Sequence, residues 1–185
     1  LTMARHCLPS STLRTVIPSI SMKWVTYVTK GTVATEDERF YQHNGIDVLG
    51  IARAVWVNVT HTGHEGASTI TQQFVRNTIL ADEATESTLK RKVREAYIAI
   101  KLEESYSKDE ILQMYLNTIN YGQGAYGIQA AAQRYYGKDA KDLTIAQAAT
   151  LIGIPQSLRT TTPSTIPKTA RTVATWFLTV CSPMA

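Results

Sequence analysis

Acidic residues are missing from both ends of the chain. None of the 15 Asp and Glu residues precedes Glu36, and none follows Asp142. The segment between these two residues also holds 12 of the 19 Lys and Arg residues, so its charge is −3 (12 minus 15), although the whole chain carries +4. Because the basic excess comes from the two ends, the net charge gives no support for nucleic-acid binding.

Several sequence signals are also absent. The two cysteines, Cys7 and Cys181, stand near opposite ends, so they form no metal-binding or redox spacing. No apolar run is long enough to span a bilayer, and no segment has the layout of a signal peptide. No glycine-rich phosphate loop and no Ser-His-Asp order is present. These absences argue against a nucleotide-binding protein and a serine hydrolase.

The composition is that of a globular protein, with 44% hydrophobic and 18% charged residues in 185 positions. Helical periodicity runs through residues 30–158, which we expect to form one domain. Residues 1–29 and 159–185 have no acid and no clear periodicity. We leave both ends unassigned, with the hypothesis that they are non-native sequence, for example from a shifted reading frame.

Within the central segment the pattern predicts helices only. Their expected ranges are 46–59, 66–80, 88–104, 107–119, 125–136 with a stop at Gly137, and a last helix from Thr144 that ends before Gly153 and Pro155. Three helices begin with a capping-box pair, in which Ser or Thr precedes Glu or Gln by three positions: Thr69 with Gln72, Ser107 with Glu110, and Thr144 with Gln147.

Helical spacing also predicts which side chains are buried. In the helix over 107–119, the core face is Ile111, Leu112, Tyr115 and Ile119. In the helix over 88–104, the buried stripe is Leu89, Val93, Ala96 and Ile100. Arg91 and Glu95 fall opposite that stripe, which favours an ordinary surface ion pair.

The apolar segment around Trp56 allows two interpretations. Val55, Trp56 and Val57 form either an exposed apolar surface that touches a membrane or part of a buried core helix. The segment is apolar without a clean period, and the buried helix is the favoured interpretation.

The segment over 35–47 gathers acids, aromatics and a histidine. Glu36, Asp37 and Glu38 are consecutive, and an Asn44-Gly45 turn follows. One interpretation is a helix start, with Thr35 and Glu38 as a capping box. The other is a catalytic carboxylate, for which Glu36 is our candidate. From this segment alone, capping is favoured.

Two polar segments follow. His61, His64 and Glu65 suggest a metal site, but their spacing matches no familiar zinc pattern and we do not favour one. Gln72, Gln73 and Arg76 share a helix face that suits a sugar and a phosphate, or is simply solvated.

The central segment resembles the family 51 glycosyltransferases over residues 30–157. These are the peptidoglycan glycosyltransferase domains of class A penicillin-binding proteins and the monofunctional transglycosylases. Four motifs in the expected order carry the resemblance: Glu36, Asp37, Phe40, His43 and Gly45; Gly66, Ser68, Thr69, Ile70, Thr71, Gln72 and Gln73; Arg91, Lys92 and Glu95; Lys108, Ile111, Leu112, Tyr115, Leu116 and Asn117.

There are departures from the family pattern. Arg76 stands where the family often has Lys, and Gln113 where many members have Glu. A fifth motif with two arginines is not recognisable, and Ala170-Arg171 is at best a remnant of it. The family's N-terminal membrane helix and its transpeptidase domain are not recognised either.

The resemblance implies a mostly α, lysozyme-like glycosyltransferase domain at the outer face of the bacterial cytoplasmic membrane. The substrate would be lipid II, polymerised onto a growing lipid-linked glycan with inversion. The implied partners are these two lipids, the membrane surface and other cell-wall synthesis proteins, with no nucleic acid. No cofactor is required and no metal ligands are assigned, although a divalent cation, Mg²⁺ or Mn²⁺, is an optional component.

The resemblance also assigns roles. Glu36 would be the general base for a sugar hydroxyl, and Glu95 the second catalytic residue, which orients cations or assists at the leaving group. The implied substrate-binding residues are Asp37, Phe40, His43, Ser68, Thr69, Gln72, Gln73, Arg76, Arg91 and Lys92. The three cations among them would offset the charge of a departing pyrophosphate.

Two alternatives remain open. A lysozyme-like lytic glycosidase also needs a Glu and a helical frame, but it has no pyrophosphate for the cations to hold. The other alternative is an inactive fragment that binds lipid II without turning it over.

Overall fold

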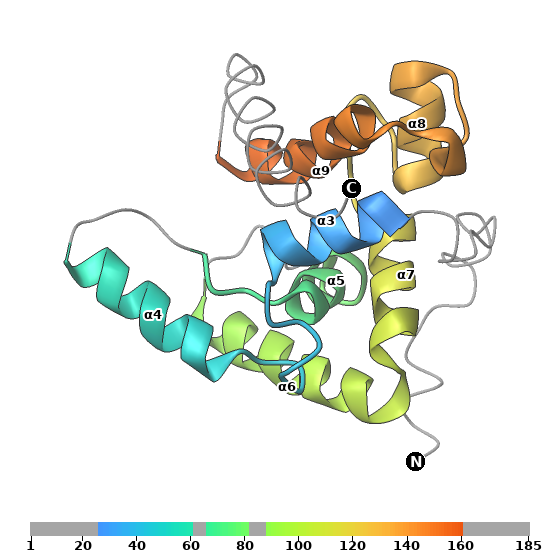
Figure 1. The fold of residues 1–185 in the computed structure, drawn as a ribbon. Coiled ribbons are helices and arrows are strands. Elements are labelled where there is room, and N and C mark those ends of the chain that lie inside the picture. The colour runs from blue at the N-terminus through green and yellow to red at the C-terminus, as the bar shows by residue number, and fades with distance from the viewer. Residues whose placement is uncertain (1–25, 61–65, 82–87, 161–185) are drawn as a thin grey trace. The chain divides into compact units, whose positions relative to one another are not determined.

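The computed structural model describes residues 26–60, 66–81 and 88–160. Within these ranges the chain forms seven α-helices and one short 3-10 helix (Figure 1). They are α3 (Thr26–Glu36), α4 (Val48–Val59), α5 (Ile70–Thr78), α6 (Leu89–Ser105), α7 (Lys108–Thr118), α8 (Ile128–Tyr136), η3 (Ala140–Asp142) and α9 (Ile145–Thr160). The described residues hold no strand, only an isolated antiparallel bridge between Asn120 and Tyr126. The mostly helical fold expected from the sequence is confirmed.

These elements belong to two compact units. The described part of the first unit runs from Glu36 to Tyr115, and that of the second unit comprises residues 26–35 and 116–160. The first unit therefore contains α4, α5, α6 and most of α7, and with them most of the motif residues. All contacts discussed below lie within one unit.

The core of the first unit is built on α5 and α7. α5 packs against α6 and buries Ile70, Phe74 and Val75 completely. On α7, Ile111 and Leu112 are also fully buried. Tyr115 and Ile119 are buried too, which confirms the core face predicted for residues 107–119.

All three predicted capping boxes are present. The Thr69 side chain accepts from the Gln72 N–H, and the Gln72 side chain accepts from the Thr69 N–H. The same reciprocal bonds join Ser107 to Glu110 and Thr144 to Gln147. Each box satisfies backbone donors that a helix start would otherwise leave unpaired.

The capping box predicted at Thr35 and Glu38 is wrong. These residues lie at the end of α3 and in the turn after it, where the Phe40 N–H donates to the Asp37 carbonyl. Acids at a helix C-terminus oppose the helix dipole, so capping chemistry does not explain the acidic run. The residues before it form α3, a helix that is not among the expected ranges.

The prediction that the Trp56 helix is buried is also wrong. Its apolar surface is exposed, and contact of this surface with a membrane stays a prediction. α4 buries only Gly50 and Ala54. Most of its apolar side chains are exposed: Val48 is 71% exposed, Trp56 is 72% exposed and Val59 is 68% exposed. Because α4 is apolar around most of its circumference, periodicity could not indicate which face packs inward.

The buried stripe predicted for α6 is wrong as well. Leu89 is 81% exposed and Val93 is 62% exposed, whereas the helix buries Glu95, Ala99 and Leu102. The physical reason is that two neighbouring cations neutralise Glu95, so this carboxylate can face inward and the apolar stripe is left outside.

In the second unit, α8 packs against η3 and α9. α8 ends as predicted at Gly137, which has a left-handed φ of 61°. The predicted end of the last helix is wrong, because α9 continues through Gly153 and Pro155 to Thr160. A proline removes one helical N–H bond, a cost that packing of Leu151 and Ile152 in the core offsets.

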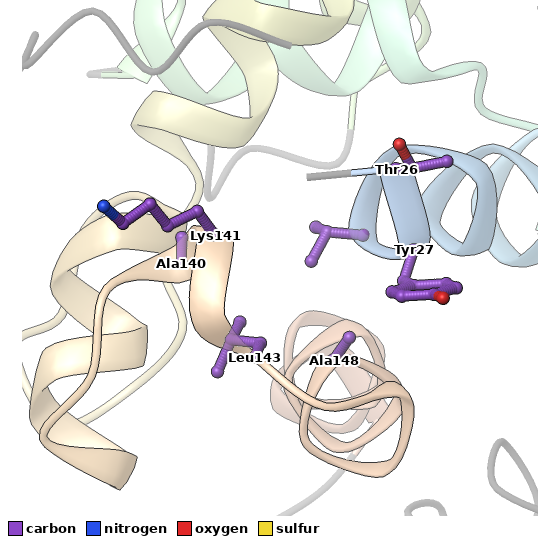
Figure 2. A pocket seen from close by; sticks show the side chains of 7 residues that line it. Thr26, Tyr27, Ala140, Lys141, Leu143 and Ala148 are labelled. Atoms are coloured by element: carbon purple, nitrogen blue, oxygen red, sulfur yellow. The ribbon is translucent and has the colours of Figure 1, made fainter. Parts of the chain in front are cut away.

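A small cavity of about 260 Å³ lies within the second unit. It is bordered by the first turn of α3, by η3 and by the start of α9, with Tyr27, Leu143 and Ala148 among its lining residues (Figure 2). None of the residues assigned to catalysis or substrate binding lines this cavity. In the described part of the chain, no helix has both the length and the apolar character needed to cross a bilayer.

Candidate active site

Glu36 is held by an amide from α5. Gln73 Nε2 donates to Glu36 Oε2 at 3.0 Å and to the Ser68 carbonyl at 3.2 Å. The other end of the amide, Oε1, accepts from the Tyr115 hydroxyl at 3.0 Å. Gln73 and Tyr115 are each 2% exposed. The Glu36 carboxylate therefore has a fixed hydrogen-bond donor that is supported from α7.

Asp37 connects the same segment to the start of α5. Its carboxylate accepts from the Ile70 N–H at 3.0 Å and contacts His43 Nε2 at 3.0 Å. The Asp37 side chain is only 3% exposed. A helix N-terminus favours negative charge. The Asp37 carboxylate therefore holds the backbone at Glu36 and Asp37 close to the start of α5, the helix that carries Gln73.

A buried row of charges continues beyond His43. Lys108 Nζ lies 3.5 Å from His43 Nδ1, 2.8 Å from the Glu103 carboxylate and 4.4 Å from the centre of the Phe40 ring. An ammonium group can only donate, so Nδ1 faces it as an acceptor and Nε2–H donates to Asp37. Glu103 also accepts from the Thr71 hydroxyl. This row links the 36–45 segment to α5, α6 and α7.

Glu95 is fully buried and has two cationic partners on its own helix. Arg91 Nη1 lies 2.8 Å from its carboxylate, and Lys92 Nζ contacts the other oxygen. The side chain of Arg91 is 11% exposed and that of Lys92 is 40% exposed. The surface ion pair predicted for Arg91 and Glu95 is therefore wrong. The three side chains carry a formal charge of +1, with Lys92 at the solvent-exposed end.

Ser68 connects the carboxylate and the cations. Its carbonyl accepts from Gln73 Nε2, and its hydroxyl accepts from Lys92 Nζ at 2.8 Å. One continuous hydrogen-bonded path thus runs from Glu36 through Gln73 and Ser68 to Lys92. The structure thus brings Glu36, Lys92 and, through Glu95, Arg91 into one network.

Other predicted residues occupy less accessible places. Thr69 and Gln72 are buried in the α5 capping box, and the Thr69 hydroxyl also donates to the Gly45 carbonyl at 2.7 Å. Phe40 has no exposed surface, and Arg76 is half-buried in the last turn of α5.

Three residues that the structure adds to the site had no catalytic or binding role in the sequence analysis: Tyr115, Lys108 and Glu103. The spacing of residues 107–119 predicted only that the side chain at position 115 is buried, and a leucine there would fit that prediction as well as a tyrosine. A buried tyrosine hydroxyl needs a hydrogen-bond partner, and this was the available signal.

Tyr41 is not a candidate base. Its hydroxyl donates to Asp109 Oδ1 at 2.9 Å. Partial burial is the main reason that the pKa of Tyr41 is raised to about 12, and this hydrogen bond to a carboxylate is the second reason. The hydroxyl therefore stays protonated at neutral pH, so Tyr41 does not compete with Glu36 for the role of base.

His61, His64 and Glu65 lie outside the described residues, so the metal interpretation of that segment stays a prediction. Within residues 26–60, 66–81 and 88–160, no three His, Cys, Asp or Glu side chains group closely enough to hold a metal ion.

A carboxylate can accept a proton, and Arg91, Lys92 and Glu95 together carry a formal charge of +1 that can bind an anion. Group transfer to a charged leaving group requires both capabilities. The model of the Transglycosylase family matches residues 11–181. The chain belongs to this family, and the resemblance carried by the four motifs is confirmed.

Similar proteins agree with this family. The chain is 52% identical over 130 residues to penicillin-binding protein 2D of Bacillus subtilis, which covers 70% of this chain and 18% of that protein. It is 49% identical over 140 residues to penicillin-binding protein 1A of Neisseria lactamica, and the match covers 75% of this chain and 17% of that protein. It is 48% identical over 136 residues to penicillin-binding protein 1A of Escherichia coli, and the match covers 72% of this chain and 16% of that protein. The chain thus spans less than a fifth of the length of these relatives.

Proposed function

We propose that this chain is a peptidoglycan glycosyltransferase domain that polymerises lipid II into glycan strands. The 4-hydroxyl of an incoming lipid II attacks the anomeric carbon of the growing lipid-linked chain. The new oxygen–carbon bond forms as the bond from that carbon to the pyrophosphate breaks, with inversion at the carbon. Family membership and the Glu36–Gln73–Ser68–Lys92 path support this proposal.

Glu36 takes the proton of the attacking hydroxyl. An alcohol is a weak nucleophile at neutral pH, so it needs a base within hydrogen-bond reach. The Gln73 amide donates a hydrogen bond to Glu36 Oε2 at 3.0 Å. The base is therefore held in one orientation by a side chain that does not itself react.

Lys92 and Arg91 bind the departing pyrophosphate. Negative charge grows on this group as the bond breaks, and fixed cations stabilise it without reorganisation. Glu95 is fully buried between the two cations, so we assign it to orienting them rather than to acid catalysis. Arg76 is the third cation in this assignment.

The buried members of the predicted substrate-binding set take a positioning role in this proposal. The side chains of Asp37 and His43 bond to each other, and those of Thr69 and Gln72 are occupied in the capping box. Ser68 and the three cations remain as the direct substrate contacts. The optional divalent cation stays a prediction.

The apolar outer faces of α4 and α6 fit a membrane surface. Trp56 and Val59 on α4, and Leu89 and Val93 on α6, are each more than half exposed. Exposed Lys90 and Arg94 flank the α6 residues. Apolar side chains beside basic ones are typical of helices that lie in the interface of an anionic bilayer. We therefore place the domain at the outer face of the cytoplasmic membrane, where its lipid-linked substrate resides.

Trp56→Ser tests the membrane contact. Because Trp56 is 72% exposed, the variant should keep its thermal stability. Its binding to phosphatidylglycerol vesicles in a sedimentation assay should be about tenfold weaker, since one large apolar side chain is lost from the lipid. Tyr126→Ser, which removes an exposed aromatic from the second unit, is the control. Equal vesicle binding by both variants would contradict this contact.

Glu36→Gln tests the base. The variant should lose lipid II polymerisation by roughly 100- to 10,000-fold, because the amide cannot accept the proton. Its circular dichroism and melting temperature should match those of the unmodified chain. Glu38→Gln, at the exposed acid two positions away, is the matched control and should polymerise normally. Polymer formed at a normal rate by Glu36→Gln would rule out this base.

The glycosidase alternative predicts a different product. A lytic enzyme needs a second carboxylate at the sugar, whereas Glu95 is enclosed with two cations. Incubation with lipid II and, separately, with finished glycan distinguishes the two activities. Polymer from lipid II supports the transferase, and soluble fragments from glycan support the glycosidase.

A further inference from the structure

The Gln73 amide can face Glu36 in two ways, because its oxygen and its nitrogen are similar in size. The hydrogen-bond partners decide which end faces the carboxylate. Two acceptors, Glu36 Oε2 and the Ser68 carbonyl, lie on one side of the amide. The Tyr115 hydroxyl lies on the other side, 3.0 Å from Oε1.

Turning the amide over would be unfavourable at the first side. The amide oxygen would then face a carboxylate and a carbonyl, which are both acceptors. The N–H groups of this buried amide would lose the two acceptors to which they now donate. Tyr115 adds to this preference, since its hydroxyl supplies a donor at the oxygen end. With Gln73 and Tyr115 each 2% exposed, water has little access to replace that donor.

We propose that Tyr115 is a positioning residue for the catalytic base, acting through Gln73. Its hydroxyl keeps the amide turned so that Nε2–H always points to Glu36. The donor holds the carboxylate in one orientation toward the substrate hydroxyl. This inference rests on the proposed role of Glu36, and Tyr115 itself touches no substrate.

Tyr115→Phe is the direct test of this role. The variant keeps the ring that packs in the core and removes only the hydroxyl. We expect kcat for lipid II polymerisation to fall about tenfold while KM stays within about twofold, because orientation of the base is lost and substrate contacts are not. Tyr135→Phe, which removes a hydroxyl bonded to the Tyr121 carbonyl at 2.8 Å, is the control and should change neither quantity.

A second variant keeps the test decisive if Tyr115→Phe folds poorly. Gln73→Met has a similar length and has no group that can donate to Glu36. It should lower kcat at least as much as Tyr115→Phe. Normal kcat in Gln73→Met would overturn the proposal.

An activity-independent measurement separates this inference from the proposed function. In ¹⁵N-labelled protein, the two side-chain N–H signals of Gln73, identified by their loss in Gln73→Met, should exchange slowly with water. Tyr115→Phe should shift these signals and speed their exchange, whereas Tyr135→Phe should not. Slow exchange in a chain that does not polymerise lipid II would support the positioning and refute the function. Unchanged signals in Tyr115→Phe, with normal kcat, would overturn the positioning.

Discussion

At the scale of single residues, the environment of a charge decides whether it serves the surface or the site. α6 contains two Lys-Glu pairs with the same spacing of three positions. Lys101 and Glu104 have side chains that are 48% and 56% exposed, whereas Glu95, the partner of Lys92, has no exposed surface. An exposed pair contributes little to stability. The buried Glu95 instead fixes the place of Lys92, and Ser68 ties that cation to the network of Glu36.

Lys92→Ala and Lys101→Ala make a matched pair of variants. Lys92→Ala should lower kcat/KM for lipid II polymerisation about 10- to 100-fold, because a cation at the leaving group is lost. Lys101→Ala should stay within about twofold of the unmodified chain. Steady-state kinetics with both variants checks this prediction. If the two variants lose activity equally, Lys92 has no special place at the leaving group.

At the scale of elements, α4 depends on its first turn because it has little buried area. Asp47 caps the helix, with its carboxylate accepting from the Gly50 N–H at 3.0 Å and from Arg39 Nη2 at 2.7 Å. Burial alone would raise the pKa of Asp47, but the Gly50 and Arg39 donors together hold this pKa below its ordinary value of 3.8. The cap therefore stabilises the folded chain only while Asp47 is ionised.

This cap predicts a pH-dependent contribution to stability. A carboxyl group with a lowered pKa in the folded state stabilises it above the ordinary pKa and loses that effect as pH falls through the folded value. Asp47→Asn should lower the free energy of unfolding by about 1 kcal/mol or less near neutral pH. The difference should shrink in urea titrations as the pH falls below the ordinary pKa of 3.8. Asp142→Asn, at an exposed carboxylate, is the control, and a difference that grows toward low pH would contradict the prediction.

At the scale of the whole molecule, the proposed chemistry is gathered in the first unit by close approaches between distant segments. Gly45 is one of them, with φ +82° and no room for a side chain. A Cβ there would lie 2.8 Å from the backbone carbon of Ala99 and from the nitrogen of Ile100. The Thr69 hydroxyl bonds to the carbonyl of the same glycine. Gly45 therefore lets the segment after Glu36 lie directly on α6 and beside α5.

Gly45→Ala and Gly124→Ala separate close approach from backbone strain. Both glycines have positive φ, +82° and +73°, but nothing lies within 4 Å of a Cβ at Gly124. Both variants should lose about 1 kcal/mol from strain. Gly45→Ala should lose about 1–3 kcal/mol more and also lower kcat, since the segment must move away from α6. Urea unfolding and lipid II polymerisation check this, and equal losses in both variants would show that the contact with α6 is unimportant.

The sequence by itself determined most of the helices, three of their caps and the family. Capping boxes such as that of Thr69 and Gln72 follow from residues three positions apart, and their hydrogen bonds form within one turn. The apolar spacing around Ile111 likewise identified the core face of α7. The four motifs, with Glu36 and Arg91 among them, are local patterns that a single chain displays before it folds.

Only the tertiary structure decided which faces of α4 and α6 lie inside. Periodicity assumes that apolar side chains are buried, and it fails where two cations make the burial of Glu95 favourable. The placement of Tyr115 behind Gln73, and of Ser68 between Glu36 and Lys92, depends on contacts between segments 24 to 42 positions apart along the chain. Such contacts leave no mark in local spacing, because they are fixed only when the helices pack.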